Sequence, residues 1–172
     1  HHPMTPPGLW FDRHDPHDMP VPDSIDDPSD YMPQHLQEAH RRHPRDQRFW
    51  VQPCGVAGDH ALVREAISAT YGMIEMIDEV IGRVVSTLDR LGQTDDTIKV
   101  FTSDHGDMMG EHGLMLKGHM PFRGTQQIPL LISAPKCPPG RTDSLASSID
   151  LGPTLMELCG IDAYDGIQGV SL

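Results

Sequence analysis

The chain has 172 residues, of which 25 are Asp or Glu and 13 are Lys or Arg, so its formal net charge is −12. This length allows one domain with a hydrophobic core, or a piece of a larger one, because a chain of about 150 residues buries roughly 70% of its unfolded surface. The acidic balance argues against a nucleic acid partner, whose binding needs a basic face. No run approaches the roughly 20 apolar residues of a membrane span.

The first part of the chain, residues 1–60, is rich in Pro, Asp and His and has no sustained period of 2 or 3.6. We predict an extended, turn-rich segment that lies on a larger body. So long a structureless stretch is unusual inside a compact domain. Its packing partners are therefore expected in sequence outside these 172 residues.

From Ala61 to Leu91, apolar residues recur at three- and four-residue steps and charged residues take the other faces. This pattern predicts one long amphipathic helix. Asp59 is the expected N-cap, and Gly92 stands where a left-handed C-terminal cap is needed.

Two short strands and a second helix are expected after this helix. Residues 97–103 predict a mostly buried strand, and residues 128–133 a second strand with Pro129 near its start. Residues 150–158 predict a short helix capped by Asp150 and ended by Gly160. Helix, turn and strand in this order indicate an α/β layer arrangement.

Asp104 and His105 directly follow the first predicted strand. In an α/β sheet they would emerge at the carboxyl end of the strand, where loops converge and ligands bind. A carboxylate and an imidazole side by side can bind a divalent cation, and the hard oxygen favours calcium, magnesium or manganese. Ser-Asp-His-Gly is also a good turn sequence, so a purely structural turn is the alternative.

Lys117 lies beyond a glycine-flanked loop that contains Glu111 and His112. If the loop folds back, the ammonium of Lys117 could meet an anionic substrate beside the metal and stabilise charge on a transferring sulfuryl or phosphoryl group. A solvated surface lysine is the alternative.

Five segments, whose order along the chain is that of the family, resemble the sulfatases of the alkaline phosphatase superfamily. Residues 101–118 (FTSDHGDMMGEHGLMLKG) look like the second metal-binding segment of that family, and residues 128–132 resemble the strand that follows it. Residues 148–155 resemble the later "D-x-x-P-T-L" helix, and residues 168–172 the "G-x-S-L" stretch. The opening residues 1–7 resemble the "P-H-x-P" segment.

The resemblance implies an α/β fold of the alkaline phosphatase-like sandwich type, with a central, mostly parallel sheet flanked by helices, and only its later part present. Residues 1–172 would be a partial catalytic domain, with the helix, strand, metal loop, strand and helix in residues 61–172. It also implies that Asp104 and His105 are metal ligands, His105 standing where many relatives have asparagine. Lys117 and His1 would contact the sulfate or leaving group. His2 is the less favoured histidine, and a purification-tag stub is the other interpretation of this pair.

The nucleophile of the family has no clear counterpart in this sequence. Sulfatases use a cysteine or serine in "C/S-x-P-x-R", converted to formylglycine, and an upstream acidic pair that completes the metal site. Residues 137–141 fit the letters of this motif, but they follow Asp104 instead of preceding it. Because their prolines and glycine also suit a turn, we interpret the match at Cys137 as coincidental. The nucleophile is expected upstream of residue 1.

We therefore expect the later part of a sulfatase, which cleaves a small-molecule or saccharide sulfate monoester with Ca2+, or with Mg2+ or Mn2+ as alternatives. By itself, the 172-residue chain is expected to be inactive. The nearer alternative is a phosphomonoester, phosphodiester or phosphonate monoester hydrolase on the same scaffold, because sulfate and phosphate esters share tetrahedral geometry. The more distant one is a non-catalytic metal-binding module.

Overall fold

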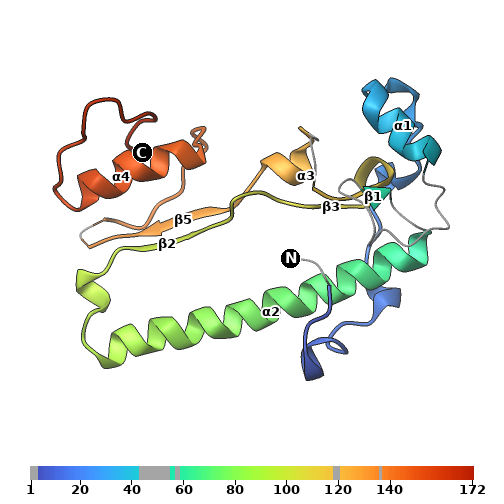
Figure 1. Cartoon of the computed structure of the whole chain (residues 1–172). Helices are drawn as coiled ribbons and strands as arrows, with labels where there is room; N and C mark the ends of the chain where they lie inside the picture. Colours follow the sequence, from blue (N-terminus) through green and yellow to red (C-terminus); the bar gives the residue numbers. More distant parts are fainter. Residues whose placement is uncertain (1–3, 43–54, 57–58, 118–120, 136) are drawn as a thin grey trace. The chain divides into compact units, whose positions relative to one another are not determined.

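The computed structural model describes residues 4–42, 55–56, 59–117, 121–135 and 137–172 (Figure 1). The chain divides into two compact units. The first unit takes in residues 1–86 and 105–128, and the second takes in residues 87–104 and 129–172. Chain segments that are distant in sequence therefore build each unit.

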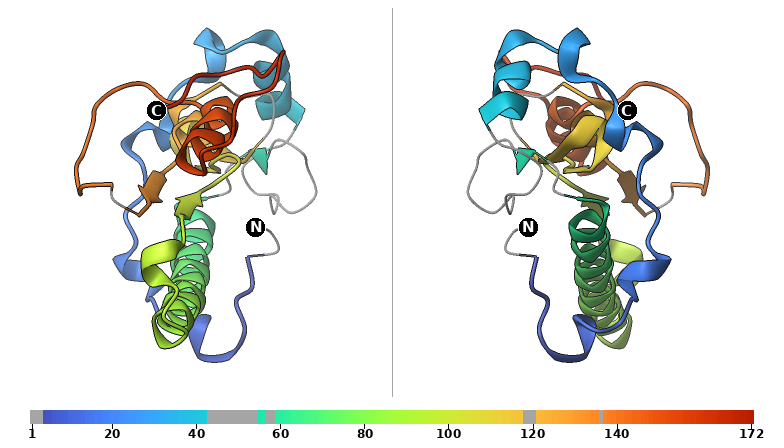
Figure 2. Two further views of the ribbon diagram at one scale, coloured as in Figure 1. Left: turned by 90° about the vertical axis from the view of Figure 1, so that its left-hand side faces the viewer. Right: turned by 90° about the vertical axis from the view of Figure 1, so that its right-hand side faces the viewer.

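The longest element is helix α2 (His60–Arg90), which Figure 2 shows nearly end-on as one continuous helix. The backbone N–H of Leu62 donates to Asp59 Oδ1 at 2.9 Å, so Asp59 caps the helix as predicted. Gly92, just beyond the helix, has φ +66°, as expected of a left-handed C-terminal cap. The predicted helix and both of its end signals are confirmed.

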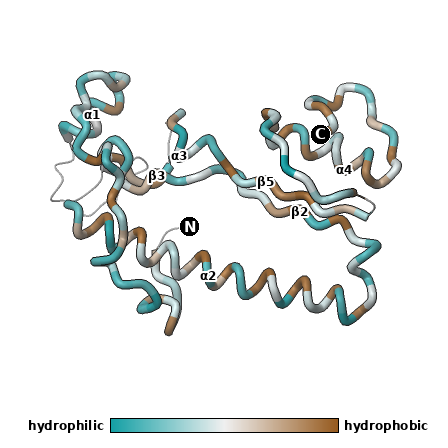
Figure 3. Tube along the Cα trace, turned by 180° about the vertical axis from the view of Figure 1, so that it is seen from behind, coloured by the Kyte–Doolittle hydropathy of each residue, from teal (hydrophilic) through white to brown (hydrophobic). Residues whose placement is uncertain are grey.

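The apolar face of α2 is buried over only the first half of the helix. Val63, Ala66 and Ala69 lie in the core, whereas Ile77 and Val84 are 50% and 57% exposed. Apolar residues continue along the whole helix in Figure 3, as the periodicity indicated. In the described structure, the amino-terminal segment packs against the first half alone.

The amino-terminal segment is turn-rich, as predicted, but it also contains a helix that we did not predict. Four 3-10 turns are followed by helix α1: Gly8–Trp10, Pro16–Asp18, Asp23–Asp26, Ser29–Tyr31 and then Gln34–Arg42. Helix α1 is nine residues long and strongly polar. Among the described side chains of α1, Leu36 is fully buried. One buried apolar residue produces no 3.6-residue hydrophobic period in the sequence, so the pattern did not predict this helix.

A small antiparallel sheet lies in the first unit. Its order is β1 (Gly55–Val56), β4 (Leu114–Leu116), β3 (Met108–Met109). Met115 and Leu116 of β4 join the core formed by α2 and the amino-terminal segment. A second cluster contains Met108 of β3 and Leu114 of β4, together with Met32 and Leu36. A short helix, α3 (Arg123–Gln126), contacts β3. This sheet and α3 hold the loop that contains Glu111 and His112.

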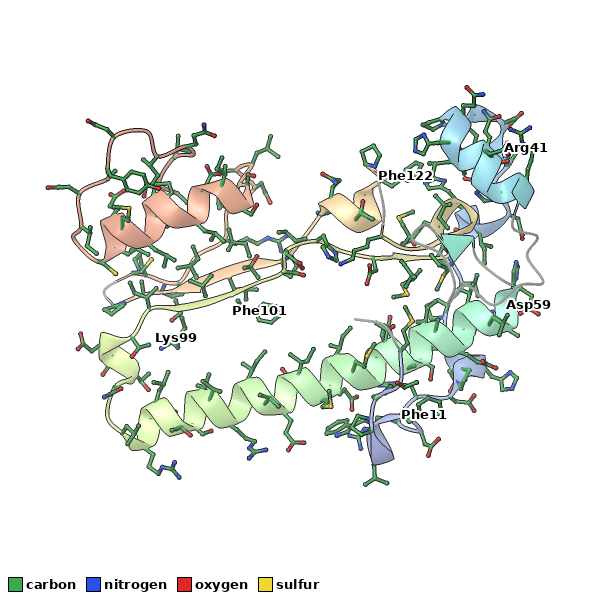
Figure 4. All side chains as sticks on the ribbon, in the orientation of Figure 1. Phe11, Arg41, Asp59, Lys99, Phe101 and Phe122 are labelled. Atoms are coloured by element: carbon green, nitrogen blue, oxygen red, sulfur yellow. The ribbon has the colours of Figure 1, made fainter. Side chains whose placement is uncertain are left out.

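The second unit contains the two predicted strands, which are shorter than expected. They are β2 (Lys99–Thr102) and β5 (Leu130–Ser133), paired antiparallel with Lys99 opposite Ser133. The expectation that the first strand is mostly buried is wrong in the described structure. Phe101 is 45% exposed and projects from β2 in Figure 4, because the described residues form only a two-stranded ladder there.

Helix α4 (Leu151–Leu158) confirms the predicted second helix, and Gly160, with φ +68°, follows its end. The cap differs from the prediction. A 3-10 turn, Ser148–Asp150, precedes α4, and Ser147 is the N-cap of that turn in a capping box with Asp150. Asp150 also accepts the N–H of Val170 at 2.9 Å, so it ties the following segment to the helix.

Every strand pair in the described residues is antiparallel. The mostly parallel sheet that we expected is therefore not formed by these strands. Between β2 and β5 the chain passes through the first unit, and β5 then runs in the direction opposite to β2. Two parallel neighbours would need a connection that returns the chain to the same end of the sheet. Among the helices described, none has both the length and the apolar composition needed to cross a membrane.

Candidate functional site

Asp104 and His105 lie directly after β2, where the sequence predicted them. Asp104 is exposed, and Ser103 Oγ lies 3.5 Å from Asp104 Oδ1. His105 is half-buried. The strand thus ends in a carboxylate followed at once by an imidazole, which is an oxygen and nitrogen donor pair of the kind that binds divalent cations.

The ring of His105 has a defined orientation. Its Nδ1 lies 2.9 Å from the carbonyl oxygen of Gly106, and its Nε2 lies 2.5 Å from Lys117 Nζ. A carbonyl oxygen only accepts, so Nδ1 carries the proton and Nε2 presents its lone pair. The fold therefore brings together two residues that the sequence singled out separately.

Gly106 allows the backbone to pack closely behind His105. A Cβ at Gly106 would overlap the carbonyl oxygen of Gly124, and the N–H of Gly106 donates to Thr125 O at 3.0 Å. Any larger residue at 106 would have to push α3 away. Helix α3 thus supports the turn that carries His105, a role that the sequence did not predict because α3 spans only four residues.

The imidazole of His112 is held by the amino-terminal segment. Its Nδ1 lies 2.8 Å from the Tyr31 hydroxyl and 3.1 Å from Asp27 Oδ2, and its ring stacks on Phe122 with centroids 4.7 Å apart. Burial, with the negative charges of Asp27 and Asp30, raises the pKa of the Tyr31 hydroxyl. Local sequence patterns could not identify this cluster, since Tyr31 and His112 are 81 residues apart.

The donor chemistry at residues 104 and 105 fits a divalent cation. The Asp104 carboxylate supplies hard oxygen, and the tautomer of His105 puts the lone pair on Nε2, where a cation would replace the contact with Lys117. In the part of the chain that the structure describes, no group of three or more His, Cys, Asp or Glu side chains forms a complete site. The two residues can thus supply part of a coordination sphere.

Two other sequence predictions concern residues away from this donor pair. His1 and His2 lie outside the described residues, so the predicted role of His1 stays a prediction. Cys137 is exposed and lies in an irregular stretch, and the next helix begins only at Leu151. Cys137 therefore does not open a helix, as the nucleophile of the resembled family must.

Comparison with known proteins identifies the family. A family model described as Sulfatase matches residues 15–161. The choline-sulfatase of Rhizobium meliloti (strain 1021) is 41% identical over 113 residues, which cover 64% of this chain and 22% of that protein. The arylsulfatase of Clostridium perfringens (strain 13 / Type A) is 33% identical over 179 residues, which cover 100% of this chain and 34% of that protein.

A solved structure extends the likeness to the fold. The phosphonate monoester hydrolase SpPMH from Silicibacter pomeroyi matches 100% of this chain and 34% of its own, with a TM-score of 0.84 and 29% identity. The chain thus spans about a third or less of the length of the relatives it matches. The α/β fold is that of sulfatases and phosphonate monoester hydrolases, and the chain belongs to the sulfatase family.

Proposed function

We propose that the whole protein hydrolyses sulfate monoesters and that residues 1–172 form part of its catalytic domain. The contact between Lys117 Nζ and His105 Nε2, at 2.5 Å, carries this proposal. A cationic side chain next to a metal-ligand nitrogen is the arrangement that binds a tetrahedral anion against a divalent cation. The larger domain is expected to be an alkaline phosphatase-like sandwich with a mostly parallel central sheet.

In this proposal, Asp104 and His105 hold a divalent cation, Ca2+ or alternatively Mg2+ or Mn2+. The cation supplies Lewis acidity, and a formylglycine upstream of this sequence supplies the nucleophile. Lys117 binds the sulfate oxygens and donates a hydrogen bond to the bridging oxygen, which stabilises the charge that develops as the S–O bond breaks. Water is consumed, and the products are the alcohol, sulfate and a proton. His1 is a further contact to the sulfate or leaving group.

Phosphonate monoester hydrolysis is the second candidate. The structure of a phosphonate monoester hydrolase covers this chain completely with a TM-score of 0.84. Lys117 and the metal ligands could serve either reaction, because sulfuryl and phosphoryl groups share tetrahedral geometry and negative charge.

The test compares two substrates on the full-length protein. After treatment with EDTA, kcat/KM is measured for 4-nitrophenyl sulfate and 4-nitrophenyl phenylphosphonate with Ca2+, Mg2+ or Mn2+ restored. We expect the sulfate ester to be preferred and Asp104→Asn to abolish its turnover. Asp95→Asn, an exposed carboxylate in the turn after α2, is the matched control and should leave turnover unchanged. A preference for the phosphonate ester would favour the second candidate, and no turnover of either ester would overturn both.

A further inference from the structure

The first unit contains a cavity of about 430 Å³ that is lined by none of the residues proposed above to bind metal or sulfate. It is lined by Met108, Glu111, His112, Phe122, Arg123, Gly124 and Gln127. These residues combine one cation, an aromatic ring, an apolar side chain and several hydrogen-bonding groups. Such a mixture is typical of a pocket for an organic ligand with a charged group.

Arg123 retains hydrogen-bond donors that an external anion can use. Its Nε donates to Gln127 Oε1 at 2.5 Å, which leaves its two terminal nitrogens and the Gln127 amide nitrogen as donors. In the part of the chain that the structure describes, no carboxylate forms an ion pair with Arg123. Glu111 also lines the cavity, but its Oε2 accepts the N–H of Met109 at 2.6 Å. Among the residues that line the cavity, Arg123 is thus the cation that can pair with an anionic ligand.

The apolar wall of the cavity is held in place. Phe122 stacks on His112 with an interplanar angle of 30°, and His112 is fixed in turn by Asp27 and Tyr31. Met108 beneath them is fully buried. A preorganised aromatic wall of this kind suits a flat apolar group, because little side-chain entropy is lost on binding.

The cavity adjoins the turn that carries the metal-ligand pair. Gly124 lines the cavity, and its carbonyl oxygen packs directly against Gly106, the residue after His105. Met108, on the same segment as His105, contributes to the cavity as well. A substrate whose sulfate is bound near His105 could therefore extend its organic part in this direction.

We propose that this cavity binds the non-sulfate part of the substrate and selects leaving groups that are flat, apolar and carry a second negative charge. The second anion pairs with Arg123 and Gln127, and the flat body packs on Phe122. The effect of this cavity on turnover rests on the proposed sulfatase function. It assigns Arg123 as a specificity-determining residue.

The experiment uses two aryl sulfates that differ in one charge, 4-carboxyphenyl sulfate and its methyl ester. The ratio of their kcat/KM values is measured for the full-length protein and for Arg123→Gln and Gln127→Glu. Arg123→Gln removes the cation, and Gln127→Glu replaces the amide donor with a carboxylate, so each variant loses a hydrogen bond to the second anion. We therefore expect the ratio of acid to ester to fall about tenfold in each variant. Gln126→Glu, at the neighbouring exposed position outside the cavity lining, is the matched control and should change the ratio much less.

Direct binding separates this proposal from the proposed function. The affinity for 4-hydroxybenzoate, the desulfated product, is measured by calorimetry and needs no turnover. If neither aryl sulfate is hydrolysed but Arg123→Gln weakens this binding about tenfold, the pocket stands and the sulfatase proposal fails. If Arg123→Gln changes neither the ratio nor the affinity, or if Gln126→Glu acts as strongly as Gln127→Glu, the pocket proposal is overturned. Thermal melting checks that each variant is folded.

Discussion

Lys117 and His105 form the contact that carries the proposed function. The Gly106 carbonyl fixes the tautomer of His105, so the lone pair on Nε2 is directed at a lysine that the chain brings back after twelve residues. Neither residue is informative alone, since single histidines and lysines are common on surfaces. Their contact supports the proposed roles because it places a ligand nitrogen and a cation at one point.

Replacing Lys117 tests its proposed role in catalysis. Lys117→Met keeps the aliphatic stem and removes the charge, so we expect kcat for 4-nitrophenyl sulfate to fall by a factor of about 10² to 10³. Lys99→Met is the control, because Lys99 on β2 donates to Thr94 O and has no proposed role. Steady-state kinetics on the full-length protein give both values, and a Lys117→Met enzyme as active as the Lys99→Met enzyme would contradict the role.

Asp150 predicts a dependence of stability on pH. The N–H groups of Val170 and Ser147 donate to its carboxylate and lower its pKa in the folded protein. A carboxyl group with a lowered pKa contributes stability above its unfolded pKa of about 3.9, and this contribution is lost as pH falls through the folded pKa. Asp150→Ala should therefore destabilise the protein at pH 7 more than at pH 2.5 in urea unfolding. Equal destabilisation at both values would contradict this assignment.

The close packing of α3 behind the turn at Gly106 is a contact between two elements. Gly106→Ala adds a methyl group where the Gly124 carbonyl already lies, so we expect a loss of about 1–3 kcal/mol in the free energy of unfolding. Gly82→Ala is the matched control in α2, where a Cβ meets no atom. That change should stabilise the protein by about 0.5–1 kcal/mol. Urea denaturation measures both effects, and equal effects would contradict the packing argument.

The two halves of α2 should respond differently to the same truncation. Val63 is fully buried and Val84 is 57% exposed. Val63→Ala should cost about 2 kcal/mol through lost burial and a cavity, and Val84→Ala less than about 0.5 kcal/mol. Thermal unfolding of the 172-residue chain tests this difference. A large cost at Val84 would mean that the exposed face of α2 is covered in solution.

Metal binding should be visible in the stability of the whole protein. A cation that binds only the folded state stabilises it by about 2.7 kcal/mol at a hundredfold excess over its Kd. We expect EDTA to lower the melting temperature of the full-length protein and Ca2+ to restore it, with His105→Ala reducing the restored increment. His17→Ala, at an exposed histidine, serves as the control and should leave it intact. An increment unchanged by His105→Ala would remove His105 from the metal site.

Local signals in the sequence predicted α2, both strands of the second unit and α4. Helix α2 could be identified because its apolar residues recur three and four residues apart over its whole length. Asp59 and Gly92 marked its two ends. The family was also predicted from ordered motifs and is confirmed by the match over residues 15–161. Helix α1 was not predicted, since a polar helix with one buried anchor has no hydrophobic period.

By itself, the sequence determined that Asp104 and His105 directly follow a strand and to which family the chain belongs, since both depend on contiguous residues. Only the tertiary structure decided which distant side chains meet. His112 contacts Tyr31 across 81 residues, and α3 packs behind Gly106. The tertiary structure also decided that β2 and β5 pair antiparallel and that both are partly exposed. Such pairings depend on the path of the chain in space, which local periodicity does not specify.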